Sequence, residues 1–311
     1  MTVRFSGSSA GVVYGTAAAL EAYLQGAGAV RYTGAPNAFG DGVATMTLIG
    51  NDGEDQTTFG TININLSDVV DTQIGGSGNN RLTGDNGQDV LIGNGGNDLI
   101  RGGAGADTMA GGEGIDWLQY TGSDAGVTVD LNADPVTGMQ AASGGDAEGD
   151  GIMEFENILG SSFDDFLIGD AGRNVIYGGD GDDLLAGWSG NDVLNGGAGA
   201  DGFIFVIDST NPGNPQIGGG DVATVLDFTA TDDSILIISI SDPAFTLDVL
   251  PENIVSNATG QAETVDQFII YNTTTGELSF DFDANGTVYD AAVFADIGLD
   301  HTITVDNFAF L

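Results

Sequence analysis

Apolar residues in the middle of the chain recur every nine positions. Residues 75–119 and residues 160–204 each divide into five consecutive nonapeptides, and the eighth position of every nonapeptide is apolar. Successive side chains of a strand point to opposite faces, so positions seven to nine predict a three-residue strand whose central residue faces a core. The ten central residues are Leu82, Leu91, Ile100, Met109, Leu118, Leu167, Ile176, Leu185, Leu194 and Phe203.

The first six positions of each nonapeptide predict a tight turn. Glycine occupies position one in all ten and position four in nine, with Phe163 as the exception, and glycine tolerates positive φ. Two nonapeptides then form one coil of a flattened spiral, and the coils stack about 4.8 Å apart. This pattern predicts an all-β chain built around a parallel β-roll. Position six is Asp in eight units and Asn in two, so these side chains align along each edge of the roll.

The chain is strongly acidic. It has 46 acidic residues against five basic residues, all arginine, and a formal charge of −41. Such a charge excludes nucleic acid as a partner and repels anionic membrane surfaces. Within the roll, the stacked carboxylates repel one another unless a cation lies between them. With no cysteine and a single histidine, His301, the available ligands are oxygens, which calcium prefers. General acidity, as in adaptation to high salt, is the alternative, but it does not explain the nine-residue phase.

The pattern G-G-x-G-x-D-x-apolar-x resembles the RTX, or haemolysin-type calcium-binding, nonapeptide family, which forms a parallel β-roll. The resemblance implies calcium ligands at position six, joined by turn carbonyls, with about six ions for two separate runs or about eight for one continuous roll. The two asparagines imply weaker sites, and Phe163 puts a regular site in doubt in its unit. The implied ligands are Asn80, Asp89, Asp98, Asp107, Asp116, Asp165, Asn174, Asp183, Asp192 and Asp201.

Position two departs from glycine in five of the units. Asp85 and Asp170 stand there and are expected to add charge to the sites. Trp188 also stands there, and its side chain is expected to project from the turn.

Residues 1–74 precede the first block of nonapeptides. Alternation over 43–49 and 57–66 predicts strands, and 16–24 favours a helix. The segment resembles part of the cadherin-like β-sandwich repeats that precede RTX blocks in large secreted bacterial proteins. This suggests a chain cut from a longer one.

Residues 120–159 separate the two blocks. A strand is predicted at 126–131 and a loop at 144–151, and the segment is similar to an insertion common in RTX rolls. Asp146, Glu148 and Asp150 either hold a further ion or belong to a solvated loop.

Residues 205–311 form a β-rich cap in this interpretation. The stretches 220–228 and 234–240 are similar to the closing segment of RTX proteins, where Asp221 and Asp227 are either ion ligands or strand-edge carboxylates. Asp281, Asp283 and Asn285 alternate as at the start of an EF-hand loop, but Ala292 stands where a bidentate Glu is required. They form either a non-helical calcium loop or a hairpin turn.

The two ends of the chain bear on export. The N-terminus has no secretory signal pattern, whereas 306–311, an acidic residue followed by apolar ones, resembles the uncleaved signal of type I secretion. An extracellular protein, secreted or on the cell surface, is therefore expected, and the secretion apparatus is an expected partner.

Catalytic motifs are few. The G-x-S-x-G stretch at 7–11 lacks a nearby base, since His301 lies at the far end of the chain, and a polar loop is the better interpretation. We expect His301 itself to be a surface or hydrogen-bonded residue. The sequence thus predicts a non-enzymatic calcium-binding module that folds on calcium and belongs to an adhesin or cell-surface protein, where surface glycans or other surface proteins are its partners. The alternative is the export and stabilising module of a secreted enzyme whose catalytic domain lies upstream.

Overall fold

The computed structural model describes residues 2–6, 12–14, 40–51, 56–66, 71–133, 139–208, 216–217, 221–239, 251–264, 267–281 and 291–310. The chain divides into two compact units, Met1–Val69 and Val70–Leu311. The predicted helix at 16–24 and the serine motif at 7–11 lie outside the described residues.

The first unit contains a four-stranded antiparallel sheet in the order β2-β1-β3-β4. The strands are β1 (Thr2–Ser6), β2 (Val12–Tyr14), β3 (Gly40–Asn51) and β4 (Gln56–Leu66). The strands predicted at 43–49 and 57–66 are confirmed as parts of β3 and β4, which pair as a long hairpin. A second sheet facing this one, as in a sandwich, stays a prediction.

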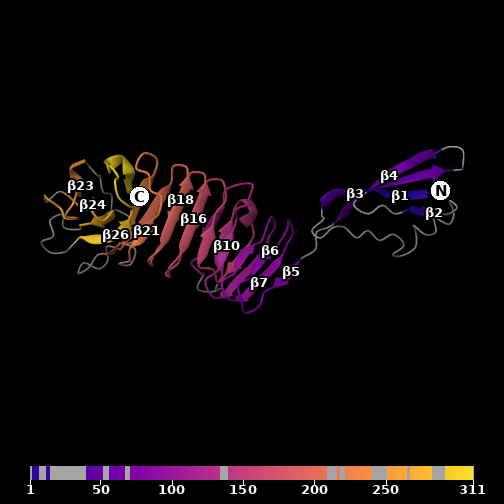
Figure 1. Ribbon diagram of the computed structural model, residues 1–311, viewed down its shortest axis with the longest axis horizontal. Coiled ribbons are helices and arrows are strands. Elements are labelled where there is room, and N and C mark those ends of the chain that lie inside the picture. Colours follow the sequence, from indigo (N-terminus) through magenta and orange to yellow (C-terminus); the bar gives the residue numbers. More distant parts are fainter. Residues whose placement is uncertain are drawn as a thin grey trace. The chain divides into compact units, whose positions relative to one another are not determined.

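The second unit consists of two sheets whose strands alternate along the chain (Figure 1). The 11-stranded sheet runs, in order, through β23 (Ile254–Asn257), β24 (Ile269–Asn272), β25 (Glu277–Phe280), β26 (Ala292–Asp296), β21 (Ala223–Val225), β18 (Val193–Ala198), β16 (Val175–Asp180), β14 (Asn157–Leu159), β10 (Trp117–Gln119), β8 (Leu99–Arg101) and β6 (Arg81–Thr83). The 12-stranded sheet runs through β27 (Phe308–Phe310), β22 (Ser234–Ser239), β19 (Gly202–Asp208), β17 (Leu184–Ala186), β15 (Phe166–Ile168), β11 (Thr128–Asp130), β12 (Gln140–Ser143), β13 (Gly151–Met153), β9 (Thr108–Glu113), β7 (Val90–Gly95) and β5 (Thr72–Ile74), and β20 (Gln216–Ile217) pairs with β19.

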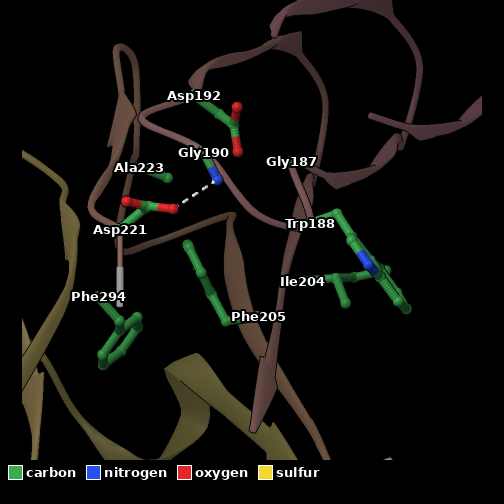
Figure 2. A pocket seen from close by; sticks show the side chains of 9 residues that line it. All are labelled: Gly187, Trp188, Gly190, Asp192, Ile204, Phe205, Asp221, Ala223 and Phe294. Carbon is green, nitrogen blue, oxygen red and sulfur yellow. Dashed lines mark hydrogen bonds between the residues drawn. The ribbon is translucent and has the colours of Figure 1, made fainter. Parts of the chain in front are cut away.

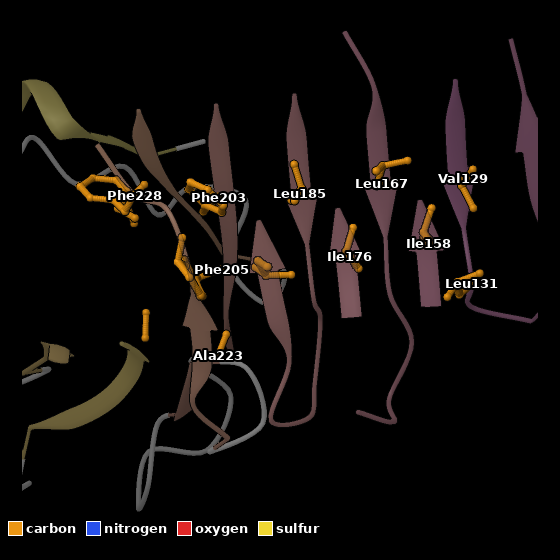
Figure 3. Close-up of a cluster of buried hydrophobic side chains, with 14 of the residues drawn as sticks. Val129, Leu131, Ile158, Leu167, Ile176, Leu185, Phe203, Phe205, Ala223 and Phe228 are labelled. Atoms are coloured by element: carbon orange, nitrogen blue, oxygen red, sulfur yellow. The ribbon is translucent and has the colours of Figure 1, made fainter. Parts of the chain in front are cut away.

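Within the blocks, parallel strands pair with partners eighteen residues away. Leu82 lies opposite Ile100, and Leu167 lies opposite Leu185, so two nonapeptides make one coil. All ten position-eight residues are buried between the sheets. Figure 3 shows Leu167 and Leu185 of one sheet facing Ile176 of the other. The predicted all-β fold with a parallel β-roll is confirmed.

The segment 120–159 continues the roll rather than interrupting it. Strand β13 pairs with β9, and β14 lies between β10 and β16, so one coil bridges the two blocks. Strands β11 and β12 widen one sheet by a hairpin before β15. Of the two arrangements that the sequence left open, the structure has a single continuous stack.

The C-terminal part extends both sheets beyond the last nonapeptide. Strand β21 pairs with β18, and β22 pairs with β19, in the two stretches expected to close the roll. Strands β26 and β27 then pair with β21 and β22. His301 belongs to this cap, where Nε2 lies 2.9 Å from the Ile297 oxygen and the ring meets the edge of Phe228.

Helices are a minor part of the described chain. They are the short 3-10 turns η1 (Gly145–Ala147), η3 (Pro251–Asn253) and η4 (Val305–Asn307). Over the described ranges, no helix has both the length and the apolar character needed to cross a membrane.

Candidate metal sites

The position-six carboxylates form the edges of the roll, directly after each turn. All eight aspartates of this set are at most 3% exposed, and Asn174 is fully buried. Each aspartate lies against the position-one glycine of its own turn and accepts a backbone N–H from the preceding coil. Burying so many carboxylates costs free energy unless hydrogen bonds or cations compensate them.

One carboxylate oxygen of each unit ties neighbouring coils together. The Oδ1 atom of Asp183 accepts the backbone N–H of Asp165 at 2.8 Å, and Oδ1 of Asp116 accepts that of Asp98 at 2.7 Å. Each acceptor stands eighteen residues after its donor. The same bond recurs along both edges and yields two ladders in which every step links a carboxylate to a peptide group.

The second oxygen has a partner only in certain units. Where position two has negative φ, its N–H donates to the position-six side chain, as Asp85 does to Asp89 and Ser161 to Asp165. Where position two has positive φ, the second oxygen can be left without that donor. Among the described residues, four buried Oδ2 atoms have no hydrogen bond, and each belongs to a unit whose position-two residue has positive φ. They are those of Asp98, Asp107, Asp116 and Asp183, in the units of Asn94, Gly103, Gly112 and Gly179.

Position-one glycines open a cradle beside these oxygens. A Cβ atom built on Gly178 would meet Oδ2 of Asp183 and lie 2.6 Å from the main-chain oxygen of Gly196, one coil further on. A Cβ on Gly93 would likewise meet Asp98 and the oxygen of Gly111. The invariance of glycine at position one therefore has a steric cause. It leaves two oxygens from different coils facing a common space.

The carboxylates resist ionisation in this environment. Burial raises the pKa of Asp183 to about 8 and that of Asp192 to about 7, from an ordinary value of 3.8. Burial likewise raises the pKa of Asp107 and Asp201 to about 6. Removing a carboxylate from water disfavours its charged form, and a bound cation reverses that preference.

These features fit a hard divalent cation. Within the part of the chain that the structure describes, no three acidic or histidine side chains form a group that could hold a metal ion by themselves. Buried carboxylate oxygens without a hydrogen bond, next to main-chain oxygens, are the ligand types that calcium takes. The residues fit calcium best at Asp98, Asp107, Asp116 and Asp183.

Other predicted ligands are already engaged. Asn174 Oδ1 accepts the N–H of Asp170 at 2.9 Å, and its amide donates to the main-chain oxygen of Glu156 at 2.7 Å. Asp165 accepts bonds from Ser161 and Val127. Asn80, on the first coil, accepts the N–H of Gly76. Ligation by the ten position-six residues as a set stays a prediction.

The aspartates at position two add charge beside the position-six carboxylates, as expected: after burial, the charge of Asp85 helps to raise the pKa of Asp107, and that of Asp170 helps to raise the pKa of Asp192. They also make hydrogen bonds within their own turns. Oδ1 of Asp85 accepts the N–H of Gly87 at 3.3 Å, and Oδ1 of Asp170 accepts that of Gly172 at 2.8 Å. They therefore shape the turn locally, as Asx turns do. Trp188 projects from its turn as predicted and is 41% exposed.

Further acidic residues occupy the place of position six outside the nonapeptides. Asp150 accepts the N–H of Asp107 at 2.8 Å, Glu156 that of Asp116 at 2.8 Å, and Asp233 that of Asp201 at 3.0 Å. Sequence reasoning missed these roles. The signal existed for Asp233, which is followed by Ser234 and buried Ile235 as in a nonapeptide without glycine.

The cap contributes two carboxylates to the last turns, and Figure 2 shows one of them, Asp221. Asp221 Oδ2 accepts the N–H of Gly190 at 3.1 Å, beside Asp192, and a cavity of about 10 Å³ lies between them. Asp227 accepts the N–H groups of Gly196 and Gly197 at 3.0 and 2.8 Å. Both side chains hold turns of the roll rather than standing free at a strand edge.

The EF-hand-like stretch lies mostly outside the described residues. Asp281 is buried, and its N–H donates to the Phe268 oxygen at 2.8 Å. Asp283 and Asn285 fall in the undescribed range 282–290, so a calcium loop there stays a prediction.

Comparison with known proteins agrees with this geometry. The fold and the turn edges define a calcium-binding β-roll. The family model of the RTX calcium-binding nonapeptide repeat matches four times, at residues 70–100, 83–118, 159–194 and 168–203. The chain therefore carries RTX calcium-binding nonapeptide repeats in both blocks.

The other comparisons add little. No curated protein matches the chain. Among solved structures, the crystal structure of the extracellular lipase LipA from Serratia marcescens matches 79% of this chain and 40% of the lipase chain, with 19% identity and a TM-score of 0.22. The chain thus spans less than half of the lipase.

Proposed function

We propose that the chain is a non-catalytic, extracellular calcium-binding module that folds on calcium after type I secretion and gives shape to an adhesin or cell-surface protein. The observation that carries the proposal is the set of four buried carboxylate oxygens without hydrogen bonds, on Asp98, Asp107, Asp116 and Asp183. Calcium supplies positive charge to these oxygens when it is bound. The chain's own residues supply the ladders that align them.

The free energies are large enough for a switch. Extracellular modules bind calcium with dissociation constants of about 10⁻⁴–10⁻³ M. At about 10 mM calcium and a constant near 1 mM, each site adds about 1.4 kcal/mol. About eight sites, the number expected for one continuous roll, add about 11 kcal/mol, comparable to the whole stability of a domain at about 5–15 kcal/mol.

Without calcium the same carboxylates oppose folding. They must stay protonated or repel one another within a chain of charge −41. A compartment poor in free calcium thus keeps the chain unfolded for passage through an export channel, and extracellular calcium folds it on emergence. Surface glycans and other surface proteins are the partners proposed for the folded module.

The same residues also suit the alternative, an export and stabilising module of a secreted enzyme. The two proposals share the roll and the calcium switch and differ only in what the roll is attached to. Expression of the native gene product, with sequencing of any region upstream of Met1, distinguishes tandem sandwich repeats from a catalytic domain.

The switch is tested by far-ultraviolet circular dichroism after chelation. Titration with calcium should convert coil into β structure cooperatively. Magnesium should do so weakly or not at all, because its small octahedral shell suits carbonyl-rich turns poorly. A chain that is fully β in chelator and unchanged by calcium would refute the switch.

A further inference from the structure

The strand that begins the roll, β5, has a polar residue where the nonapeptides have an apolar one. Residues 71–74 end directly before Gly75, so Asp71 stands at position six of a preceding unit and Gln73 at position eight. The pairing of β5 with β7 agrees with this alignment, because Gln73 lies opposite Leu91. Gln73 therefore occupies a place that is apolar in all ten nonapeptides.

The Gln73 side chain crosses from one sheet to the other. Its Nε2 donates to the main-chain oxygen of Thr83 at 2.6 Å, and its Oε1 accepts the N–H of Thr83 at 3.3 Å. Thr83 is the last residue of β6, which belongs to the facing sheet. In an antiparallel pair of strands, two opposite residues exchange the same two bonds. The amide of Gln73 thus takes the place of one residue of an added strand.

The Thr83 groups that Gln73 contacts face the open end of the roll. Figure 1 shows β5 and β6 at one end of the stack of coils, and each is the last strand of its sheet in the described part of the chain. On its other side β6 pairs with β8, where the N–H of Gly84 donates to the Arg101 oxygen at 2.9 Å. Backbone groups of successive residues in a strand point to opposite sides, so those of Thr83 point away from β8.

The apolar core ends in the same coil. Leu82 is 8% exposed, whereas the other nine position-eight residues are 0% exposed. Gln73 is half-buried, and its side chain reaches the residue that follows Leu82. A polar side chain therefore closes the layer in which an apolar one would leave an apolar end facing solvent.

This end of the roll lacks the charge that separates copies of the chain elsewhere. The first turn, 75–80, is the only one of the ten nonapeptide turns without an acidic residue, and Asp71 and Arg81 are the only charged residues of 71–83. Ile74, in β5, is 65% exposed. A chain of charge −41 repels its own copies over most of its surface, but two first coils repel each other little. Open strand edges are the surfaces on which further strands add.

We propose that the first coil is a latent interface for a second copy of this chain and that Gln73 keeps it closed. The amide occupies the groups of Thr83 that an added strand needs, and it ends the core with a polar group. A contact between two first coils would use the same surface on both copies, so association would stop at a dimer. The inference goes beyond the proposed function, because it requires no metal ligand.

The test compares the full chain with its Gln73→Leu variant in the same calcium buffer. Leucine removes both bonds to Thr83 and restores an apolar residue at position eight. In sedimentation experiments the parent should stay monomeric, and the average mass of the variant should rise with concentration toward twice that of the monomer. Gln119→Leu is the matched control, because Gln119 is half-buried in β10, away from the open end, and its Nε2 donates to the Thr121 hydroxyl. The control should stay monomeric.

A second substitution and a local measurement locate the contact. Ile74→Glu, added to Gln73→Leu, places like charges on the two facing edges and should restore the monomer. Hydrogen exchange at the Thr83 amide reports on the cap itself. In dilute solution this amide should exchange faster in Gln73→Leu than in the parent, and it should become protected again as the concentration rises.

Each contrast can overturn the proposal. A parent that associates as Gln73→Leu does, or a Gln73→Leu variant that stays monomeric like the Gln119→Leu control, would refute the closing role of Gln73. Association that Ile74→Glu does not reverse would place the contact elsewhere and refute the interface. If Gln73→Leu does not reach the β content of the parent, Gln73→Ala, which removes both bonds without adding a large apolar group, decides by the same sedimentation experiment.

Discussion

The Asp183 carboxylate accepts the backbone N–H of Asp165 at 2.8 Å through Oδ1, while its Oδ2 is buried without a hydrogen bond. A single side chain thus joins two coils with one oxygen and leaves the other for a cation. Oδ2 lacks a donor because Gly179, at position two of this unit, has a φ of 134°. In units whose position-two residue has a negative φ, the N–H of that residue donates to Oδ2.

Removing the charge of Asp183 should lower calcium affinity more than it lowers the stability of the fold. Asp183→Asn keeps one oxygen as the acceptor for Asp165 and replaces the other with an amide that cannot ligate. We expect a loss of about 1–2 kcal/mol at a fixed calcium concentration, the contribution of about one site, and partial rescue by excess ion. The calcium midpoint measured by circular dichroism checks this.

Asp182→Asn is the matched control for that variant. Asp182 is exposed, and its Oδ1 accepts the N–H of Ala200, which asparagine also accepts. If the two variants have the same calcium midpoint, Asp183 is not a ligand.

Replacing a glycine at position one should remove an ion site, because the added Cβ would occupy the space between the ligand oxygens. The Cβ of Gly178→Ala would enter the cradle between Asp183 and the Gly196 oxygen. We expect loss of ion binding there, together with about 1–3 kcal/mol of overpacking. Gly78→Ala is the control, since no atom lies within 4 Å of its Cβ. Equal calcium uptake by both variants, measured by titration calorimetry, would contradict the cradle.

Adjacent leucines of β17 should differ sharply in their contribution to the core. Leu185 is 0% exposed, and Leu184 on the opposite face is 38% exposed. Leu185→Ala should cost about 2–5 kcal/mol of unfolding free energy, and Leu184→Ala less than about 1 kcal/mol. Thermal denaturation in saturating calcium measures both, and similar melting temperatures would contradict the thin two-sheet core.

The regular part of the fold could be predicted because its physics is local. Leu167 and Leu185 are buried opposite each other since a fixed nine-residue phase puts every second unit in register. The turn glycines and position-six acids repeat with that phase. From Gly160 to Ile204 the sequence therefore predicts both the pairing of the strands and the alignment of the position-six side chains along each edge.

The coil that joins the two blocks of nonapeptides could not be predicted. Its acidic residues take the place of position six in space, but their spacing in the sequence does not follow the nine-residue period. Asp150 and Glu156 stand six residues apart, so no search at a period of nine aligns them. Their place follows from the pairing of β13 with β9 and of β14 with β10, which the sequence does not encode as a repeat. Tyr120, whose hydroxyl donates to Asp150 at 2.8 Å, is likewise brought there by the fold.

The export signal at the C-terminus should act without the rest of the roll. Deleting residues 270–311 removes β26 and β27, which pair with the closing strands of the roll, so the truncated chain should lose both export and cap stability. Appending these residues to an inert passenger tests the signal alone. The passenger should reach the medium only when a type I system is present, as measured by immunoblotting. Secretion of the truncated chain at the parent level would refute the signal.

Acidification should stabilise the ion-free roll and weaken its calcium binding. Burial raises the pKa of Asp183 to about 8 and that of Asp192 to about 7 in the folded chain, from an ordinary value of 3.8. A group whose pKa is raised by folding holds its proton more tightly in the folded state. Its contribution to stability is therefore fully present below about pH 4 and is lost as the pH rises to about 8.

Where the ion-free roll is folded, calcium must displace those protons, so its uptake should release them. The folded roll should bind calcium more tightly as the pH rises, because fewer protons compete for the ligand oxygens. The calcium concentration at half-folding should nevertheless rise from about pH 5 to about pH 8, because the protons that stabilise the ion-free roll are lost over that range. Calcium titrations followed by circular dichroism at several pH values, with pH-stat detection of released protons, measure both effects. An ion-free chain with more β structure at about pH 8 than at about pH 5 would contradict this pH dependence, because the ionised carboxylates of a metal-free roll should repel one another most at the higher pH.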